Sequence, residues 1–305
     1  MKMFNKHSLQ KQIGDMSKST TLEHLKPVER YFLKEINKLP VDQDYDVNAN
    51  EPPWFRTMSY TEIAHSFMMY PLSPVVSTRQ MQEAFEHDVE VKLDYVKYLK
   101  DRIHSDVANK YSHMKNKKIE PRDHLIVPVG SNKLIETVCI NKLKYIINTH
   151  GEDEVYLKPH PLTTHEIVGS LRDELGEKVV LDRDDNLYKL LIEAEVVYTS
   201  HRSESILYAV ALGKEVDCID VYQKAHEGTF FNIANNIFER KTNEEQKNFI
   251  QKAFNSYKSG IVNPELDENW KDRIDQYLDY IMKLREEYRY KYLWNESGTM
   301  ERRKE

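Results

Sequence analysis

The sequence predicts a mixed α/β protein built around a parallel β-sheet in the middle of the chain. Between residues 123 and 240, short apolar runs rich in β-branched residues alternate with segments of helical periodicity. Such alternation is typical of a parallel sheet with right-handed crossovers. Residues 1–122 hold few strand-like runs and are expected to form a mostly helical domain. Residues 241–305 are expected to add C-terminal helices.

Each element of the central sheet follows from its local pattern. Strands are expected at residues 124–129, 154–158, 178–181, 195–199 and 216–219. Helices are expected between them, at residues 134–148, 167–175, 187–194 and 203–212, the last of these ended by Gly213. The chain has no Gly-x-Gly-x-x-Gly pattern, so a nicotinamide or flavin site is not expected.

The flanking segments are expected to be mainly helical. Helical spacing of apolar residues predicts helices at residues 21–38, 60–70, 78–111, 244–257 and 270–292. Residues 42–53 are expected to form an acidic loop, and residues 71–78 an extended segment interrupted by proline. The basic linker at residues 110–122 marks the expected boundary between the first two domains.

Composition limits the class of protein. The chain has 305 residues, of which 40% are hydrophobic, enough for one large or two modest domains with a proper core. The net charge of −6 gives no overall basic footprint for nucleic acid. Cys139 and Cys218 fall in apolar segments and are expected to be buried free thiols in a reducing compartment. No signal peptide and no apolar run of membrane-spanning length is visible, so a cytoplasmic location without a membrane partner is expected.

The stretch Tyr156-Leu-Lys158-Pro-His160-Pro161 is the most informative part of the sequence. It follows an expected strand and precedes a helix start, which places it at the carboxyl edge of the sheet, where open α/β folds bind ligands. The two prolines stiffen the turn, so the imidazole of His160 is expected to point off the edge. Thr163 or Thr164 is expected to cap the next helix, with Glu166 closing a capping box. The structural alternative is a helix-entry turn with a solvent-exposed histidine.

A second polar stretch follows the fourth expected strand and again opens a helix. Its residues offer hydroxyl groups and helix-start backbone donors to an anion, and they are Thr199, Ser200, Ser203, Glu204 and Ser205. The alternative is an ordinary helix cap. Gly130 and Ser131, with Asn132, follow the first expected strand and form a candidate third wall of the same site.

The Lys158-Pro-His160-Pro161 stretch resembles the His-Pro motif of nucleotide-sugar-dependent glycosyltransferases of the GT-B class, including bacterial sialyltransferases, Kdo transferases and glycerol-phosphate transferases. The resemblance covers about residues 124–232. It implies a Rossmann-like donor-nucleotide-binding domain at residues 123–240, in which His160 contacts the donor phosphate and the hydroxyl-rich stretch contacts it from a second side. It also implies that the C-terminal helices pack back on an acceptor-side domain at residues 1–122. A full GT-B enzyme has a second Rossmann-like domain there, and this sequence does not predict one.

The chemistry that this resemblance implies is transfer of a sugar from a UDP- or CMP-linked donor, with no permanently bound cofactor. The imidazole, Lys158 and helix N-termini would stabilise the leaving phosphate without a metal ion. The acceptor hydroxyl needs a general base, and the N-terminal candidates are Glu62, His65, Asp44 and Asp46. Asp182, Asp184 and Asp185 are expected to form a solvated turn that caps the next helix in preference to a divalent-ion site. The segment His226-Glu-Gly228 either lines the sugar pocket or serves a turn.

The acceptor expected first is hydroxymethylated cytosine in phage DNA. Extruding a base from a duplex calls for a basic rim and apolar wedges, and Trp54, Phe55, Arg56, Arg79 and the basic linker are candidates for them. A surface polysaccharide or small glycan is the alternative acceptor. A nucleotide-sugar epimerase and a non-catalytic nucleotide-binding module are the alternative functions. The sequence leaves the oligomeric state open.

Overall fold

The computed structural model describes residues 22–36, 38, 58–71, 74–105, 119–128, 140–220, 229–294 and 300–302. These residues belong to two compact units. One, which we call the hairpin unit, comprises the described residues up to Asp94, residues 229–232 and those from Gln251 on. The other, the sheet unit, comprises those from Tyr95 to Asp220 and from Ile233 to Ile250. The expected domain boundaries after residues 122 and 240 stay a prediction.

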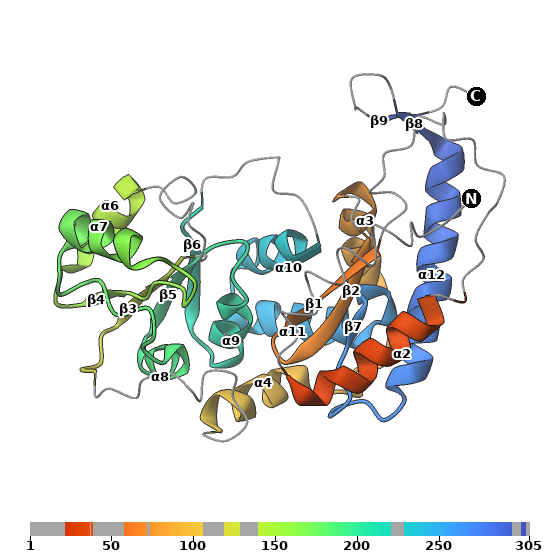
Figure 1. Ribbon diagram of the computed structural model, residues 1–305, viewed down its shortest axis with the longest axis horizontal. Coiled ribbons are helices and arrows are strands. Elements are labelled where there is room, and N and C mark those ends of the chain that lie inside the picture. Colours follow the sequence, from red (N-terminus) through yellow and green to blue (C-terminus); the bar gives the residue numbers. More distant parts are fainter. Residues whose placement is uncertain are drawn as a thin grey trace. The chain divides into compact units, whose positions relative to one another are not determined.

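The sheet unit contains a four-stranded parallel sheet (Figure 1). Its strands are β3 (His124–Val127), β4 (Val155–Leu157), β5 (Val196–Thr199) and β6 (Glu215–Cys218), in the order β4-β3-β5-β6. Every pairing is parallel, and the register places Val127 beside Thr199 and Thr199 beside Cys218. The protein is therefore a mixed α/β protein with a central parallel sheet, as the sequence predicts.

The third expected strand is reduced to one parallel bridge, between Val180 and Leu157. The N–H of Leu157 donates to Val179 O at 2.8 Å, and the N–H of Leu181 donates to Leu157 O at 2.9 Å. With this bridge, the five runs lie in the spatial order third, second, first, fourth, fifth. Rossmann-like doubly wound sheets have this order, so the sheet is compatible with that fold.

Helices bury both faces of this sheet. On one face α6 (Ile140–His150) and α7 (His165–Leu175) share a core with strand residues such as Ile126 and Leu157. Because side chains alternate along a strand, Leu125 and Val197 face the other way, and they are equally buried. On that side α9 (Ser205–Ala211) contacts β5, β6 and α4 (Tyr95–His104). Burial on both faces explains why β3, β4 and β5 are almost continuously apolar, whereas the edge strand β6 is only partly buried and carries Glu215 and Asp217.

Local capping sets the helix starts in the sheet unit. Thr164 caps α7 by accepting a hydrogen bond from the Ile167 N–H at 3.4 Å. Asn186 caps α8 (Leu187–Glu193) by accepting from the Tyr188 N–H at 3.0 Å. The cap position of α9 is Glu204, which makes no side-chain capping bond, and Ser203, the residue before it, accepts from the Ser205 N–H at 3.4 Å.

The hairpin unit departs most from the sequence prediction. The helix expected at residues 60–70 is a β-hairpin of β1 (Met58–Ile63) and β2 (Ser66–Pro71), and β2 also pairs with β7 (Ile261–Val262). Its tight turn places Ala64 at φ 48° and His65 at φ 61°. Hairpin turns with two positive φ values normally carry Asn or Gly, so the sequence lacked the usual turn signal. Phe67 and Met69 both lie in the core and alternate with their neighbours along the strand, and the prediction assigned them to the apolar face of a helix.

The prediction of one long helix at residues 78–111 is also wrong. The chain forms α3 (Pro74–Glu86) and α4, with residues 87–94 between them. The side chain of Asn255 stabilises the non-helical segment between them. Its Oδ1 accepts from the N–H groups of Lys92 and Leu93, and its Nδ2 donates to Leu93 O. The segment expected to be extended up to residue 78 turns helical at Pro74, a residue that suits the first helical position.

In the core of the hairpin unit, a helix near the end of the chain packs against helices near its beginning. The helix α12 (Trp270–Lys291) packs against α2 (Lys26–Ile36) and α3. Short elements complete the fold: η1 (Glu23–Leu25), η4 (Tyr257–Ser259) and the strands β8 (Tyr292–Trp294) and β9 (Met300–Arg302). Two helices, α10 (Thr229–Phe238) and α11 (Asn243–Asn255), contribute residues to both units. None of the described helices has the length and apolar character needed to cross a lipid bilayer.

Candidate functional site

The sheet order places a candidate site at the carboxyl ends of β3 and β5. These strands are neighbours, and the chain leaves them toward opposite sides of the sheet, which makes the crevice between them the usual ligand site of such folds. The segment after β5 carries the predicted hydroxyl groups. The segment after β3 holds Gly130 and Ser131, which lie outside the described residues.

His160 lies in the turn after β4, the strand that pairs with β3, and it is half-buried. The N–H of Leu162 donates to the ring Nδ1 at 3.1 Å, and the N–H of Thr163 donates to His160 O at 2.9 Å. A ring nitrogen that accepts a hydrogen bond carries no proton, so the neutral imidazole holds its proton on Nε2. The turn therefore fixes the tautomer and makes Nε2 a hydrogen-bond donor.

Lys158 was expected to face the phosphate, and its bonds run inward instead. The side chain is 2% exposed. Its Nζ donates to Pro159 O at 2.6 Å and to Arg183 O at 2.8 Å. Burial lowers the pKa of Lys158 to about 8, although the carboxylates of Asp185, Asp184 and Asp182 act in the opposite direction. In this state the lysine fastens the acidic turn to the end of β4.

The acidic turn is stabilised by its own hydrogen bonds. Asp185 Oδ2 accepts from the Asp182 N–H at 2.9 Å, and Asp182 Oδ1 pairs with Arg172 at 2.6 Å. Asn186, the next residue, caps α8. The carboxylates of Asp182, Asp184 and Asp185 approach within 4.8 Å of one another. The predicted turn before a helix is present, but it is not fully solvated, because Asp185 is 2% exposed, and the helix is capped by Asn186 and not by one of the three aspartates.

The hydroxyl groups after β5 form a chain. Thr199 Oγ1 donates to Val127 O at 3.2 Å and lies 2.8 Å from Ser205 Oγ, which lies 2.6 Å from Ser203 Oγ. Because a hydroxyl has one proton, the donation by Thr199 makes Ser205 donate to Thr199 and Ser203 donate to Ser205. The half-buried oxygen of Ser203 then ends the chain as an acceptor. An anion bound here would have to turn the Ser203 hydroxyl away from Ser205.

Two further predicted residues shape the same loop. Ser200 is 1% exposed, and its Oγ accepts from the Arg202 N–H at 3.1 Å, while its carbonyl accepts from the Ser203 N–H at 3.1 Å. These bonds make a tight turn between β5 and α9. Glu204 is half-buried at the cap position of α9.

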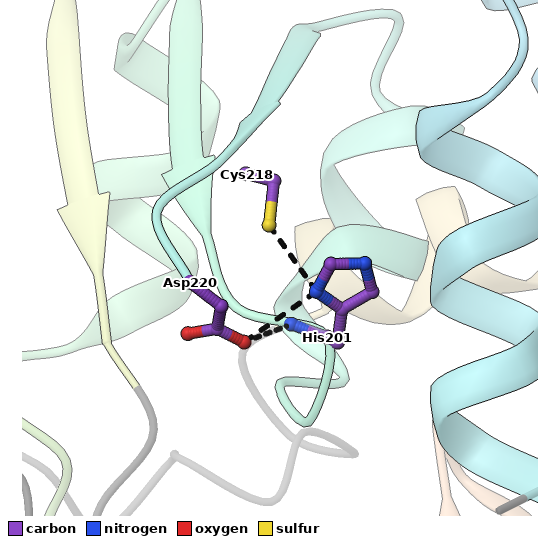
Figure 2. Close-up of side chains that lie close together, drawn as sticks. All are labelled: His201, Cys218 and Asp220. Carbon is purple, nitrogen blue, oxygen red and sulfur yellow. Dashed lines mark hydrogen bonds and ion pairs between the residues drawn. The ribbon is translucent and has the colours of Figure 1, made fainter. Parts of the chain in front are cut away.

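Sequence reasoning missed a cluster of His201, Cys218 and Asp220 at the same edge of the sheet. Figure 2 shows the Nδ1 atom of His201 facing both other side chains, with Cys218 Sγ at 3.2 Å and Asp220 Oδ2 at 3.5 Å. Burial alone lowers the pKa of His201, but its hydrogen bonds to Asp220 and Cys218 outweigh burial and raise the pKa to about 9. Cys218 is half-buried, not fully buried as expected. The available signal was that all three residues end or follow neighbouring parallel strands.

Two of the four predicted general bases, Glu62 and His65, are described, and they lie in the hairpin unit in positions that the sequence did not suggest. Glu62 is a half-buried residue of β1. His65 sits in the hairpin turn with its side chain fully buried, and its carbonyl accepts from His24 Nε2 at 2.9 Å. Asp44 and Asp46 lie outside the described residues, as do Trp54, Phe55, Arg56 and His226.

Arg79, a candidate for a basic rim, is paired with carboxylates. It lies beside a hollow of about 400 Å³ in the hairpin unit. Its Nε contacts Glu83 at 2.6 Å, and its guanidinium makes a two-pronged contact with Glu287 at 3.0 Å. Lys258 also approaches Glu83, at 3.4 Å. These pairs neutralise the cation, so the charge of Arg79 does not favour a nucleic-acid phosphate.

Comparison with known proteins adds no relative to this description. No family model matches the chain, and neither a curated protein nor a solved structure matches it significantly.

Proposed function

We propose that the sheet unit binds the phosphate of a nucleotide-activated sugar and that the protein is a glycosyltransferase that passes the sugar to an acceptor hydroxyl. The observation that carries the proposal is the fixed tautomer of His160, whose Nδ1 accepts from the Leu162 N–H. Its Nε2–H is then a donor at the ligand-binding edge of a parallel sheet.

The surroundings of His160 suit an anion. The α7 helix begins five residues later, and the first-turn N–H groups of a helix carry partial positive charge. The turns after β4 and β5 start about 10 Å apart, because β3 lies between these strands. A nucleotide phosphate chain with its sugar would reach from one turn to the other. Donation from Nε2 to the leaving phosphate would strengthen as its charge grows in the transition state.

The substitution His160→Asn tests this role without removing the turn. An Asn side-chain oxygen accepts from the N–H two residues on, so it replaces Nδ1 and keeps the Leu162 bond. It has no donor in the position of Nε2. One hydrogen bond to a charged group is worth about 1.5–3 kcal/mol, so affinity for UDP or CMP and donor turnover should fall roughly ten- to a hundredfold. His165→Asn, at an exposed position of α7, is the matched control.

The measurements are calorimetric titration with UDP, CMP, CDP and GDP, followed by donor hydrolysis with and without candidate acceptors. Hydroxymethylated DNA and a glycan serve as the two acceptors, because the residues expected to contact DNA lie outside the described part of the chain or, like Arg79, are paired. Absence of binding by any nucleotide, or unchanged affinity in His160→Asn, would overturn the proposal. Binding without transfer to either acceptor would leave a nucleotide-binding module in place of an enzyme.

A further inference from the structure

Three metal-binding side chains meet where β5 and β6 end. His201 follows β5 by two residues, Cys218 ends β6, and Asp220 lies two residues further on. Thr199 and Cys218 are register partners, so the two strand ends are side by side. The ligand atoms of the three side chains all lie within 4.8 Å of one another. A thiolate, an imidazole and a carboxylate together form a ligand set that suits zinc.

The distances fit a tetrahedral ion. Zinc bonds of about 2.0–2.3 Å place neighbouring ligand atoms of a tetrahedron about 3.3–3.6 Å apart. His201 Nδ1 lies 3.2 Å from Cys218 Sγ and 3.5 Å from Asp220 Oδ2. The pair of Cys218 and Asp220 lies within 4.8 Å, so closure of this pair by about 1.5 Å or less completes the set.

The orientation of the ring distinguishes a metal site from a catalytic triad. In a triad, the nucleophile and the orienting carboxylate bond to opposite nitrogens of the imidazole. Here the sulfur and the carboxylate both face Nδ1, as Figure 2 shows. Groups that converge on one point are arranged for a shared ion, and they are poorly arranged to relay a proton across the ring.

Neighbouring groups hold the three side chains in place. The backbone N–H of His201 donates to Asp220 Oδ2 at 2.8 Å and orients the carboxylate. The ring of Phe238 packs edge-on against the imidazole, with 5.0 Å between centroids. Lys142 bonds to the carbonyl of Cys218. Supporting contacts of this kind pre-orient ligands and raise metal affinity.

We propose that His201, Cys218 and Asp220 bind one Zn²⁺ ion, with water in the fourth position. Sites with three protein ligands and one open position are typical of zinc that meets an exogenous ligand. The bound ion would tie the loop after β5 to the end of β6, at the same sheet edge as His160. The site depends on none of the residues on which the proposed glycosyltransferase role rests, so either proposal can fail alone.

Metal titration of the chelator-stripped full chain tests the site. Zn²⁺, measured by competition with a chromophoric chelator, should bind with one equivalent at high affinity. Co²⁺ in its place should give tetrahedral ligand-field bands and a thiolate-to-cobalt charge-transfer band. Loss of a supporting residue typically costs 10–100-fold in metal affinity, so loss of a ligand in Cys218→Ser, His201→Gln or Asp220→Asn should cost roughly a hundredfold or more. Cys218→Ser should also abolish the charge-transfer band.

Matched variants separate this site from other metal-binding groups. Cys139→Ser removes the other cysteine, and Asp184→Asn removes one carboxylate of the acidic turn. Both variants should keep the affinity and the charge-transfer band. Circular dichroism of the metal-free variants shows whether they fold, and the half-buried Asp220 provides the test if Cys218→Ser does not. The proposal is overturned if stoichiometric binding is absent, if Cys218→Ser retains the band, or if Cys139→Ser removes it.

Discussion

The two units of the molecule use their buried polar side chains differently. In the hairpin unit these groups connect segments that are far apart in the sequence: Arg273 bonds to carbonyls at residues 254–256 and 261, and the Tyr277 hydroxyl donates to Met69 O at 2.9 Å. In the sheet unit they gather after strand ends, where some bonds are local, as that of His160 to Leu162, and others join neighbouring strands, as that of Thr199 to Val127 O. Long-range bonds hold a fold together. Local bonds at a sheet edge can change with less loss of stability, and this leaves such groups available to a ligand.

Among the substitutions that test this contrast, the largest loss of stability is expected at Gly260. This residue has φ +73°, and its carbonyl accepts from the Met69 N–H at 2.8 Å. A Cβ there would lie 2.1 Å from Met69 O and 2.9 Å from the ring of Tyr277. Left-handed strain of about 1–2 kcal/mol and overpacking of about 1–3 kcal/mol add up, so Gly260→Ala should lower the free energy of unfolding by about 4 kcal/mol. Urea titration would measure the loss.

Gly213 of the sheet unit provides the comparison. Its φ is +82°, yet the nearest atom to an added Cβ is Asn243 Oδ1 at 4.0 Å. Gly213→Ala therefore carries only the left-handed strain, about 1–2 kcal/mol. Equal losses for the two glycine variants would contradict the view that close long-range packing distinguishes the hairpin unit.

Arg273 should show the second largest effect. Its Nε donates to Ile261 O at 2.8 Å, and its other nitrogens donate to Asn255 O at 2.9 Å and Ser256 O at 3.1 Å. Arg273→Met removes the arginine donors to the buried Ile261 and Asn255 carbonyls, whereas Ser256 O keeps its bonds from Ser259, so a loss of about 3 kcal/mol is expected in the same urea titration. Arg273→Lys should recover less than half, because an ammonium cannot reproduce the planar fork of donors. Full recovery by lysine would show that charge alone matters.

The sequence predicted the sheet unit better than the hairpin unit, and the reason is the range of the interactions involved. The strands and helices of the sheet unit are set by local patterns, such as the β-branched run before Thr199 and the caps at Thr164 and Asn186. The hairpin depends on β7, which is distant in the chain and pairs with Phe67 and Met68. Nothing local in the sequence encodes that partner.

The sequence predicted which polar segments follow β4 and β5, but it did not predict the directions of their side chains. Its position after β4 and β5 followed from strand order, which a sequence reveals through alternation of elements. The direction of a long side chain does not follow in this way: Lys158 turns inward to Arg183 O, and the imidazole of His201 turns toward Cys218. Both directions depend on which neighbouring segments supply carbonyls, thiols or carboxylates once the chain has folded.

The next largest change in stability is expected from the titration of Lys158. Its folded pKa, about 8, lies below the ordinary 10.5, so the unfolded chain binds more protons than the folded chain between these values. The titration of Lys158 should therefore add a rise in stability above about pH 8, on the order of 2 kcal/mol up to about pH 9.5, while His201, whose folded pKa of about 9 lies above its ordinary 6.5, loses stability as the pH rises through the same range. Tyr31 works in the opposite direction at higher pH, because burial and its bond to Asp275 raise its pKa to about 12. Urea titrations between about pH 7 and 9.5 avoid that range.

Lys158→Met should remove this rise, which is measured as the difference between the unchanged protein and the variant because His201 titrates in both. Lys189→Met, which removes an exposed lysine of α8, should keep it. An unchanged rise in Lys158→Met would show that another group is responsible and that the inward bonds of Lys158 do not describe its charged state.

The smallest effect is expected at the start of α7, where the contrast between the units is most directly tested. Thr164 accepts from the Ile167 N–H at 3.4 Å, a long bond, so Thr164→Ala should cost about 0.5–1 kcal/mol, at the low end for a helix cap. Ser170→Ala, on the exposed side of the same helix, should cost less. Because the Leu162 bond to His160 lies before the helix, nucleotide affinity should stay within about twofold of the unchanged protein. A larger loss of affinity would mean that the cap, and not the imidazole, organises the proposed nucleotide site.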